Sequence, residues 1–258
     1  MTDGGFRDPT ASYSRVMPLL PGPAEFAEHE GDHSHRDVSG GALRAATFGA
    51  MDGLVTNIAL VAGVGGGGAD RNAIILTGMA GLVAGAFSMA LGEFASVQTQ
   101  NDAVAGEVAI ERAELALHPK AEEAELVDMY RQMGLTQQTA EAVAREVHAD
   151  PELALKVHVT QELGVDPDEQ PSPWTAALSS FVCFAVGGVV PLLSFLLGSS
   201  SLAVSLLVGA VGLFALGAVT SRFTGKPWWF AGGRQLLFGA IAAGATFLVG
   251  SLIGASVA

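Results

Sequence analysis

The sequence contains very little cysteine and few basic residues, and both shortages exclude classes of function. Cys183 is the only cysteine, so one chain can build neither an internal disulfide nor a thiolate metal site. Thirteen Lys and Arg stand against 26 Asp and Glu, which gives a formal net charge of −13. Nucleic-acid binders need clustered Lys and Arg to contact phosphates, so we expect no nucleic-acid partner.

Phosphate-binding motifs are also missing. The glycine run at residues 65–68 is not followed by the Lys-Ser/Thr that a P-loop requires. We therefore expect no nucleotide site, which argues against an ATP-driven pump and favours transport driven by an ion gradient.

Charge is scarce and very unevenly distributed. Only 15% of the residues are charged, and residues 174–258 contain no acidic residue at all. Residues 98–170, in contrast, hold sixteen of the 26 Asp and Glu and five of the thirteen Lys and Arg. Together with a mean hydropathy of +0.41, this pattern indicates lipid-soluble segments combined with one acidic, water-soluble block.

Five segments are long and apolar enough to cross a bilayer, whose hydrocarbon core needs roughly 20 helical residues. They occupy residues 45–67, 73–97, 174–198, 202–221 and 236–258. Each is apolar around its whole circumference, unlike a helix at the surface of a soluble protein. We therefore predict an all-α, polytopic membrane protein of five transmembrane helices, with a helical insert between the second and third.

The composition divides the chain into four regions. Residues 1–41 form a polar, Pro- and Gly-containing tail that we expect to be disordered. Its histidines, His29, His33 and His35, belong either to a solvated tail or to a weak metal-capturing segment. Transmembrane helices 1–2 are expected at 42–98, the acidic metal-binding domain at 99–172, and transmembrane helices 3–5 at 173–258.

Helix-breaking residues divide the insert into three to four helices. The first can continue the second apolar segment without a break. The predicted pieces run up to residue 117 and then over 121–133, 136–148 and 151–164.

The short links between the apolar segments predict the orientation. Arg222, Lys226 and Arg234 lie between the fourth and fifth segments, whereas the other short links carry almost no charge. The positive-inside rule then puts the N-terminus and the insert in the cytoplasm and the C-terminus outside. We expect the membrane to be a bacterial plasma membrane.

Three residues of the first two apolar segments are candidate transport-pathway residues. Asp52 has no Lys or Arg inside any segment to pair with, so it must be protonated, near water or bound to a cation. Met89 and Glu93 lie four residues apart, hence on one helix face. Packing of Met89 and an interfacial position for Glu93 are the alternatives.

Carboxylates and imidazoles recur in the insert at helical spacing. Carboxylates from two helices and an imidazole from a third could close around a divalent transition metal, whereas a solvated acidic face is the alternative. The aligned groups are Glu107, Glu111, Glu114 and His118 on the first helix, Glu122 and Glu125 on the second, and His158 and Glu162 on the last.

Three sequence runs resemble the vacuolar iron transporter family. They are HSHRDVSGGALRAATFGAMDGLVTNIALVAGV, LTGMAGLVAGAFSMALGEFASVQTQ and VGGVVPLL, and with the insert the similarity covers roughly residues 33–256. The resemblance implies a homodimer of five-span subunits that exports cytoplasmic Fe²⁺ in exchange for protons, and not an enzyme.

The resemblance also implies site residues. The family's intramembrane aspartate and methionine fall on Asp52 and Met89. Its cytoplasmic metal-binding glutamates match the five positions Glu111, Glu114, Glu122, Glu125 and Glu162, with Glu107 and His118 as weaker candidates from spacing alone.

This chain departs from the family pattern at several positions. His158 and Val159 replace an adjacent pair of methionines, and Gly81 replaces a glutamate on the cytoplasmic side of the second segment, for which Glu93 is a candidate substitute. Met51 stands where bacterial relatives often carry Asn. These changes leave Fe²⁺, Mn²⁺ and other divalent metals open as substrates.

Two other functional classes remain open at this stage. A membrane-anchored carboxylate di-iron oxidase built on the insert would need Glu-x-x-His motifs, which residues 98–170 lack. A metal-storage or sensor protein would leave Asp52 unexplained.

Overall fold

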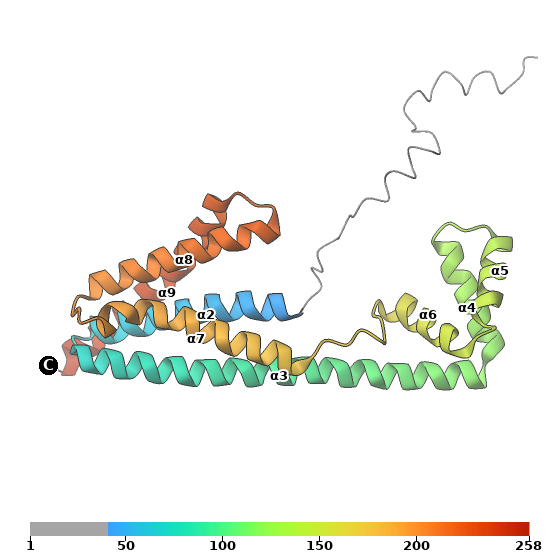
Figure 1. The fold of residues 1–258 in the computed structure, drawn as a ribbon, viewed down its shortest axis with the longest axis horizontal. Helices are drawn as coiled ribbons and strands as arrows, with labels where there is room; N and C mark the ends of the chain where they lie inside the picture. Colours follow the sequence, from blue (N-terminus) through green and yellow to red (C-terminus); the bar gives the residue numbers. More distant parts are fainter. Residues whose placement is uncertain (1–40, 258) are drawn as a thin grey trace, which may run out of the picture. The chain divides into compact units, whose positions relative to one another are not determined.

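The computed structural model describes residues 41–257, which form eight α-helices and no strand (Figure 1). The helices are α2 (Gly41–Gly66), α3 (Arg71–Leu117), α4 (Pro119–Gln132), α5 (Gln137–Val147), α6 (Pro151–Leu163), α7 (Pro173–Leu196), α8 (Leu202–Thr224) and α9 (Trp228–Val257). Helices α2, α3, α7, α8 and α9 are long and apolar enough to cross a membrane. The prediction of an all-α protein with five such helices is therefore confirmed. His29, His33 and His35 lie outside the described residues.

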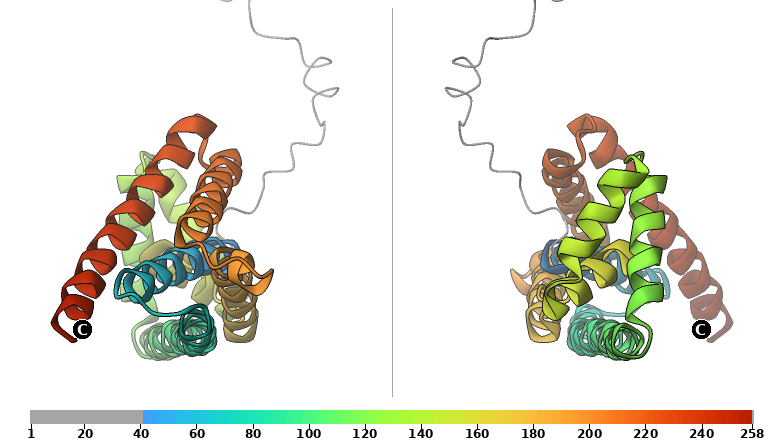
Figure 2. Two further views of the ribbon diagram at one scale, coloured as in Figure 1. Left: turned by 90° about the vertical axis from the view of Figure 1, so that its left-hand side faces the viewer. Right: turned by 90° about the vertical axis from the view of Figure 1, so that its right-hand side faces the viewer.

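Helix α2 is the centre of the apolar bundle, because it contacts each of the other four long helices. Glycines bring α2 and α7 close together. A Cβ atom on Gly53 would collide with the backbone of Phe184, and one on Gly187 would collide with the carbonyl of Ala50. Small residues allow such close approach between helices in lipid. Figure 2 shows the bundle from one end, with α9 at its periphery.

Two buried polar groups of the bundle form hydrogen bonds between helices. Asn57 is fully buried, and its Nδ2 donates a hydrogen bond of 2.6 Å to the carbonyl of Gly188. Ser205 Oγ donates one of 2.6 Å to the carbonyl of Pro191, a proline inside α7. Such bonds fix helix register in lipid, where an unpaired polar group is unfavourable.

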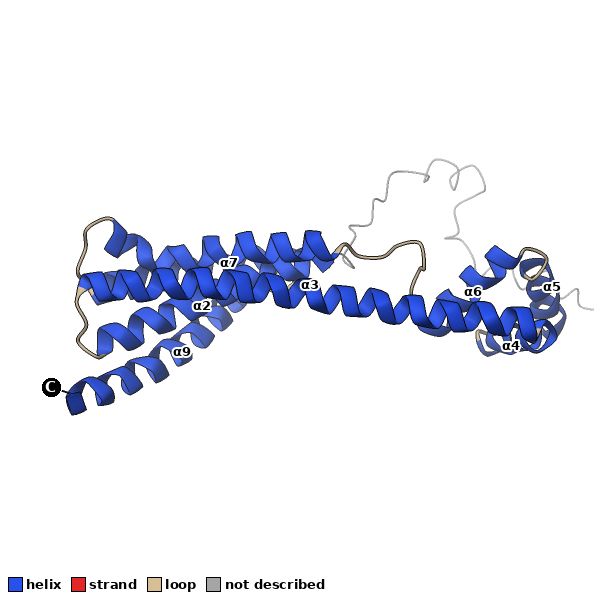
Figure 3. Ribbon diagram, turned by 90° about the horizontal axis from the view of Figure 1, so that it is seen from below, coloured by secondary structure: helices blue, strands red, loops and turns tan. Residues whose placement is uncertain are grey.

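Helix α3 joins the bundle to the insert without interruption. Its 47 residues correspond to about 70 Å at 1.5 Å per residue. Residues 73–97 form its apolar part, which is long enough to cross a membrane. The remaining residues continue past the apolar bundle to the short helices α4 and α6 (Figure 3).

The helices of the insert begin and end at the predicted breaks, to within two residues. Pro119 and Pro151 occupy the first turns of α4 and α6, where a missing backbone N–H has no consequence. Gly134 and Gly164 adopt positive φ after α4 and α6, as helix-ending glycines do. A small apolar core, which includes Leu126, Ala140, Ala144, Val147 and Ala154, holds α4, α5 and α6 together.

Ion pairs fasten α6 to its surroundings. Arg112 on α3 contacts Glu152 at 2.7 Å, and Lys156 contacts Asp168 at 2.8 Å and Asp166 at 3.1 Å. These exposed pairs contribute little free energy each. They nevertheless position α6 along α3, with which it shares the candidate site described below.

The fifth long helix begins earlier than predicted. Helix α9 starts at Trp228, whereas its apolar segment was expected at 236–258. Arg234 does not interrupt the helix, because arginine is a good helix former and its long side chain can extend to solvent. The link between α8 and α9 is thus reduced to residues 225–227, and Arg222 and Arg234 lie on the flanking helices.

Candidate metal centre

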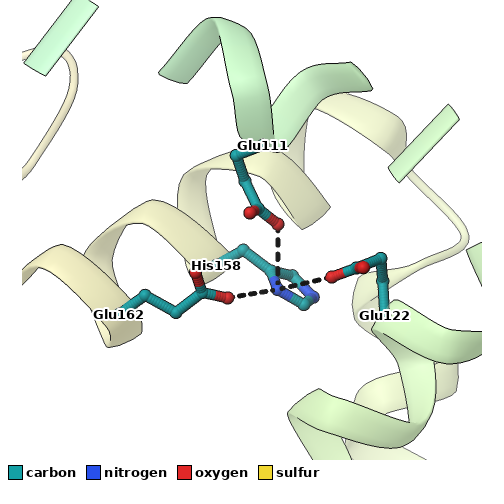
Figure 4. A group of neighbouring side chains, drawn as sticks. All are labelled: Glu111, Glu122, His158 and Glu162. Carbon is teal, nitrogen blue, oxygen red and sulfur yellow. Dashed lines mark hydrogen bonds and ion pairs between the residues drawn. The ribbon is translucent and has the colours of Figure 1, made fainter. Parts of the chain in front are cut away.

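Four side chains from three helices converge in the insert (Figure 4). Glu111 comes from α3, Glu122 from α4, and His158 and Glu162 from α6. One ligand-type atom of each lies within 4.8 Å of the corresponding atoms of the other three. The chain turns at His118, Pro119 begins α4, and α4 leaves the end of α3 at a steep angle (Figure 1).

His158 lies at the middle of the group and is fully buried. Its Nδ1 is 3.1 Å from Glu162 Oε1, 3.2 Å from Glu111 Oε1 and 3.8 Å from Glu122 Oε2. Glu111 and Glu122 are largely shielded as well, with side-chain exposures of 12% and 11%, whereas the Glu162 side chain is 29% exposed. The imidazole therefore presents one nitrogen to three carboxylates.

The three carboxylates repel one another in this small volume. Burial is the main reason why the pKa of Glu111 is raised above 4.5, and the neighbouring charge of Glu162 raises it further. Burial likewise raises the pKa of Glu122, with an added contribution from Glu125. A divalent cation would remove both the repulsion and the penalty of burying negative charge.

Hydrogen bonding within the group is incomplete. A neutral imidazole has one N–H, and the Nδ1 of His158 makes its hydrogen bond with Glu162. Glu111 Oε1 is buried and has no hydrogen-bond partner among the described residues. A buried acceptor without a donor is unfavourable, and a cation at this point would satisfy it.

The chemical types of the four ligand groups limit which metal ions would fit the site. Three carboxylates and one imidazole suit divalent ions such as Mn²⁺, Fe²⁺, Co²⁺ and Zn²⁺. No sulfur atom belongs to the group, so it lacks the soft ligands that favour Cu(I).

The other predicted ligands of the insert lie outside this group of four. Glu114 and His118 are exposed and face each other at 3.8 Å. Glu107 and Glu125 are exposed too, although Glu125 is near enough to affect the pKa values of Glu111 and Glu122. Val159 is fully buried and has no ligand atom.

Sequence reasoning missed a second imidazole beside the group. His148 follows the last turn of α5, and its Nε2 lies 3.1 Å from His158 Nε2. Burial and the neighbouring His158 lower the pKa of His148, so this imidazole is neutral near pH 7. No spacing within one helix reveals the pair, because the turn between α5 and α6 brings the two residues together.

The candidate pathway residues lie on the paired helices α2 and α3. Asp52 is half-buried, and its Oδ1 accepts a hydrogen bond of 3.2 Å from Thr56. At 1.5 Å per residue, Asp52 is about 21 Å along α2 from the turn that joins the two helices, and Met89 is about 27 Å along α3. The two residues therefore lie at similar distances from the turn between α2 and α3.

Glu93 has a partner that the sequence did not predict. Its Oε2 lies 3.3 Å from Arg44 Nη2, and its side chain is 12% exposed against 68% for Arg44. Gly81 is twelve residues earlier, which is about 18 Å along the helix. At Gly81 itself, Leu60 of α2 fills the space next to the backbone. Glu93 thus does not replace a side chain at position 81.

Five long apolar helices and a buried cluster of carboxylates around an imidazole define a polytopic helical membrane protein with a candidate divalent-metal centre. The sequence model of the VIT family matches residues 43–251. The chain belongs to this family.

Curated relatives from plants and an amoeba agree with the family match. Vacuolar iron transporter 1 of Oryza sativa subsp. japonica is 28% identical over 234 residues, which are 90% of this chain and 93% of that protein. Vacuolar iron transporter 1 of Arabidopsis thaliana is 28% identical, covering 86% of this chain and 90% of that protein. The vacuolar iron transporter of Acanthamoeba castellanii is 34% identical, covering 80% and 74% respectively.

Proposed function

We propose that the protein transports Fe²⁺, or a similar divalent ion such as Mn²⁺, out of the cytoplasm in exchange for protons. The observation that carries the proposal is the convergence of Glu111, Glu122, His158 and Glu162 on a chain with five apolar helices. Membership in a family whose relatives are named iron transporters supports it. In this proposal the ion leaves the cytoplasm either across a plasma membrane or into a vacuole.

In this proposal the insert gathers the ion on the cytoplasmic side. The positive charges around the link between α8 and α9 support that orientation. Glu114 and Glu125, at the edge of the group of four, add negative charge that raises the local cation concentration. Glu107 and His118 would contribute only in this indirect way.

The ion would then cross along α2 and α3. Met89 would offer a thioether, which prefers transition metals to Mg²⁺ or Ca²⁺. Asp52 would bind the ion or a proton in turn, because the two compete for one carboxylate. Glu93 would act at the cytoplasmic mouth, where Arg44 already balances its charge. A homodimer would place two such pairs of helices side by side.

Proteoliposome flux tests the proposal. Uptake of Fe²⁺, Mn²⁺, Co²⁺ and Zn²⁺ is measured with and without an imposed pH gradient, against empty liposomes. We expect Fe²⁺ flux that accelerates with the gradient and moves protons in the opposite direction. Flux that ignores the pH gradient would refute the exchange, and flux no faster than in empty liposomes would refute transport. Oxygen consumption on addition of Fe²⁺, monitored in parallel, would instead indicate an oxidase.

A further inference from the structure

The contact between His148 and His158 is the most informative feature that the proposed transport does not use. The two Nε2 atoms are 3.1 Å apart, and the rings meet edge to face with an interplanar angle of 78°. His158 is fully buried, so solvent does not compete for this nitrogen.

The two nitrogens of His158 have different partners. Nδ1 faces the three carboxylates, whereas Nε2 faces His148. A histidine that binds a metal through one nitrogen generally uses the other in a hydrogen bond, which fixes both the ring orientation and the position of the proton.

We propose that His148 is a positioning residue for metal binding: it holds the His158 ring with Nδ1 toward Glu111, Glu122 and Glu162, and it complements His158 Nε2 in both the metal-free and the metal-bound protein. The proposal rests on the proposed function, because it takes the group of four as the ion's binding site. It adds the residue that directly follows α5 to a site otherwise built by α3, α4 and α6.

The hydrogen-bond roles reverse when an ion binds. In the metal-free protein, His158 carries its proton on Nδ1 and donates to Glu162, so Nε2 accepts a hydrogen bond from the Nε2–H of His148. In the metal-bound protein, Nδ1 must offer its lone pair to the ion, so His158 carries its proton on Nε2 and donates to His148 Nε2.

The protons of the pair balance across this change. The proton on His158 Nδ1 leaves to solvent by way of Glu162, and His158 Nε2 takes up the proton shared between the two Nε2 atoms. His148 Nδ1 in turn takes one proton from solvent. Two protons are present on the pair before and after. An imidazole suits this position because one nitrogen can serve as donor or as acceptor according to the tautomer.

His148 does not act as a fourth-helix ligand to the same ion. Its Nε2 contacts the ring edge of His158 that points away from the carboxylates. An ion bound at Nδ1 of His158 therefore lies on the far side of that ring from His148.

Metal affinity of the full chain in detergent tests the proposal with Zn²⁺ as the probe. His148→Leu removes the hydrogen bond, whereas His148→Gln keeps an amide that can turn to donate or accept. Gln138→Leu, at an exposed position of the same helix, is the control for an apolar substitution on α5. We expect His148→Leu to weaken Zn²⁺ binding by about tenfold to hundredfold, and His148→Gln and Gln138→Leu to bind as the unsubstituted protein does.

A second measurement reads the proton positions in the unsubstituted protein. In the ¹⁵N-histidine-labelled full chain, nitrogen shifts distinguish protonated from unprotonated ring nitrogens. We expect His158 Nε2 to change from unprotonated to protonated on addition of Zn²⁺, and His148 Nε2 to change in the opposite sense. His158→Gln and His148→Gln assign the signals.

Each outcome has one meaning. Equal affinity in His148→Leu and the unsubstituted protein, equal losses in both His148 variants, loss of one bound Zn²⁺ per chain on substitution, or unchanged nitrogen shifts would each overturn the proposal. If His158→Gln itself leaves Zn²⁺ affinity unchanged, the group of four is not the binding site, and the failure lies with the proposed function instead.

Discussion

Arg44 and Glu93 form a 3.3 Å ion pair between α2 and α3. Arg44 lies as many residues before the end of α2 as Glu93 lies after the start of α3. The two residues therefore lie side by side, at the end of the helix pair that is far from the connecting turn. The charge of Glu93 is balanced by a neighbour, whereas Asp52 has only the hydroxyl of Thr56 as a described partner.

Because Glu93 is already paired, removing its charge should affect transport less than removing that of Asp52. We expect Glu93→Gln to retain most of the metal flux in proteoliposomes. The double substitution Arg44→Gln with Glu93→Gln should be no worse, because it removes both charges of the pair and leaves neither without a partner. Abolition of flux by Glu93→Gln alone would mean that its carboxylate contacts the ion directly.

Asp52→Asn should uncouple metal flux from the pH gradient while leaving metal binding to the insert unchanged. The amide cannot bind a proton in place of the ion. The metal-binding group of the insert lies far from Asp52, so its affinity should not change. The measurement pairs flux under a pH gradient with equilibrium metal binding of the same protein. Asp102→Asn, at an exposed position of α3, is the control. Coupled flux in Asp52→Asn at the unsubstituted rate would refute this role.

Glu111→Gln should have opposite effects on the metal-free and metal-bound protein. It removes one of three mutually repelling carboxylates, so we expect a higher melting temperature without metal, by about 2–4 °C for each kcal/mol gained. It also removes a ligand, so Zn²⁺ should stabilise the variant much less than the unsubstituted protein. Thermal unfolding with and without Zn²⁺ measures both, and a lower melting temperature without metal would contradict the repulsion.

The raised pKa values of Glu111 and Glu122 set the direction of a pH dependence. A carboxyl whose pKa is higher in the folded than in the unfolded protein favours folding at low pH, and this contribution is lost as the pH rises through the folded value. Metal binding requires the ionised form and so strengthens over the same window. We expect the stabilisation by Zn²⁺ to grow from pH 4.5 upward and to level off above the raised values. In Glu111→Gln this growth should be smaller.

Two glycines should respond differently to the same substitution. A Cβ at Gly53 meets backbone atoms of α7, which cannot move independently, whereas a Cβ at Gly81 meets the end of the Leu60 side chain, which can change rotamer. We expect Gly53→Ala to destabilise the protein by about 1–3 kcal/mol or more, as overpacking does. Gly81→Ala should change the melting temperature only slightly. Equal losses in both would contradict the close packing of α2 on α7.

Much of the fold could be predicted because its signals are local. The apolar segments follow from composition, and Pro119, Gly134 and Pro151 mark the breaks of the insert to within two residues. The sequence misplaces the beginning of α9, because a charged residue such as Arg234 indicates a link, although it can remain helical near the end of an apolar helix.

The candidate site could be predicted only in part, because its geometry depends on how helices fold back on one another. Helical spacing aligned Glu107, Glu111 and Glu114 on one face, yet of these Glu111 alone faces His158. Which carboxylate points inward is decided by the turn at His118 and by the packing of α6. The contacts of His148 with His158 and of Arg44 with Glu93 join different helices, so no periodic pattern within one helix contains them.

The continuity of α3 has a mechanical consequence. Glu111 lies about 33 Å beyond Met89 on the same helix. The helix is unbroken between the two residues. On the proposed route, an ion released from the group of four would therefore travel a distance comparable to the thickness of the hydrocarbon core before it reached the thioether. A stiff rod of this length also acts as a lever, since a small tilt of its membrane part displaces the insert by several ångströms. In the proposed transporter, metal binding to the insert and the tilt of α3 would thereby be coupled through one helix.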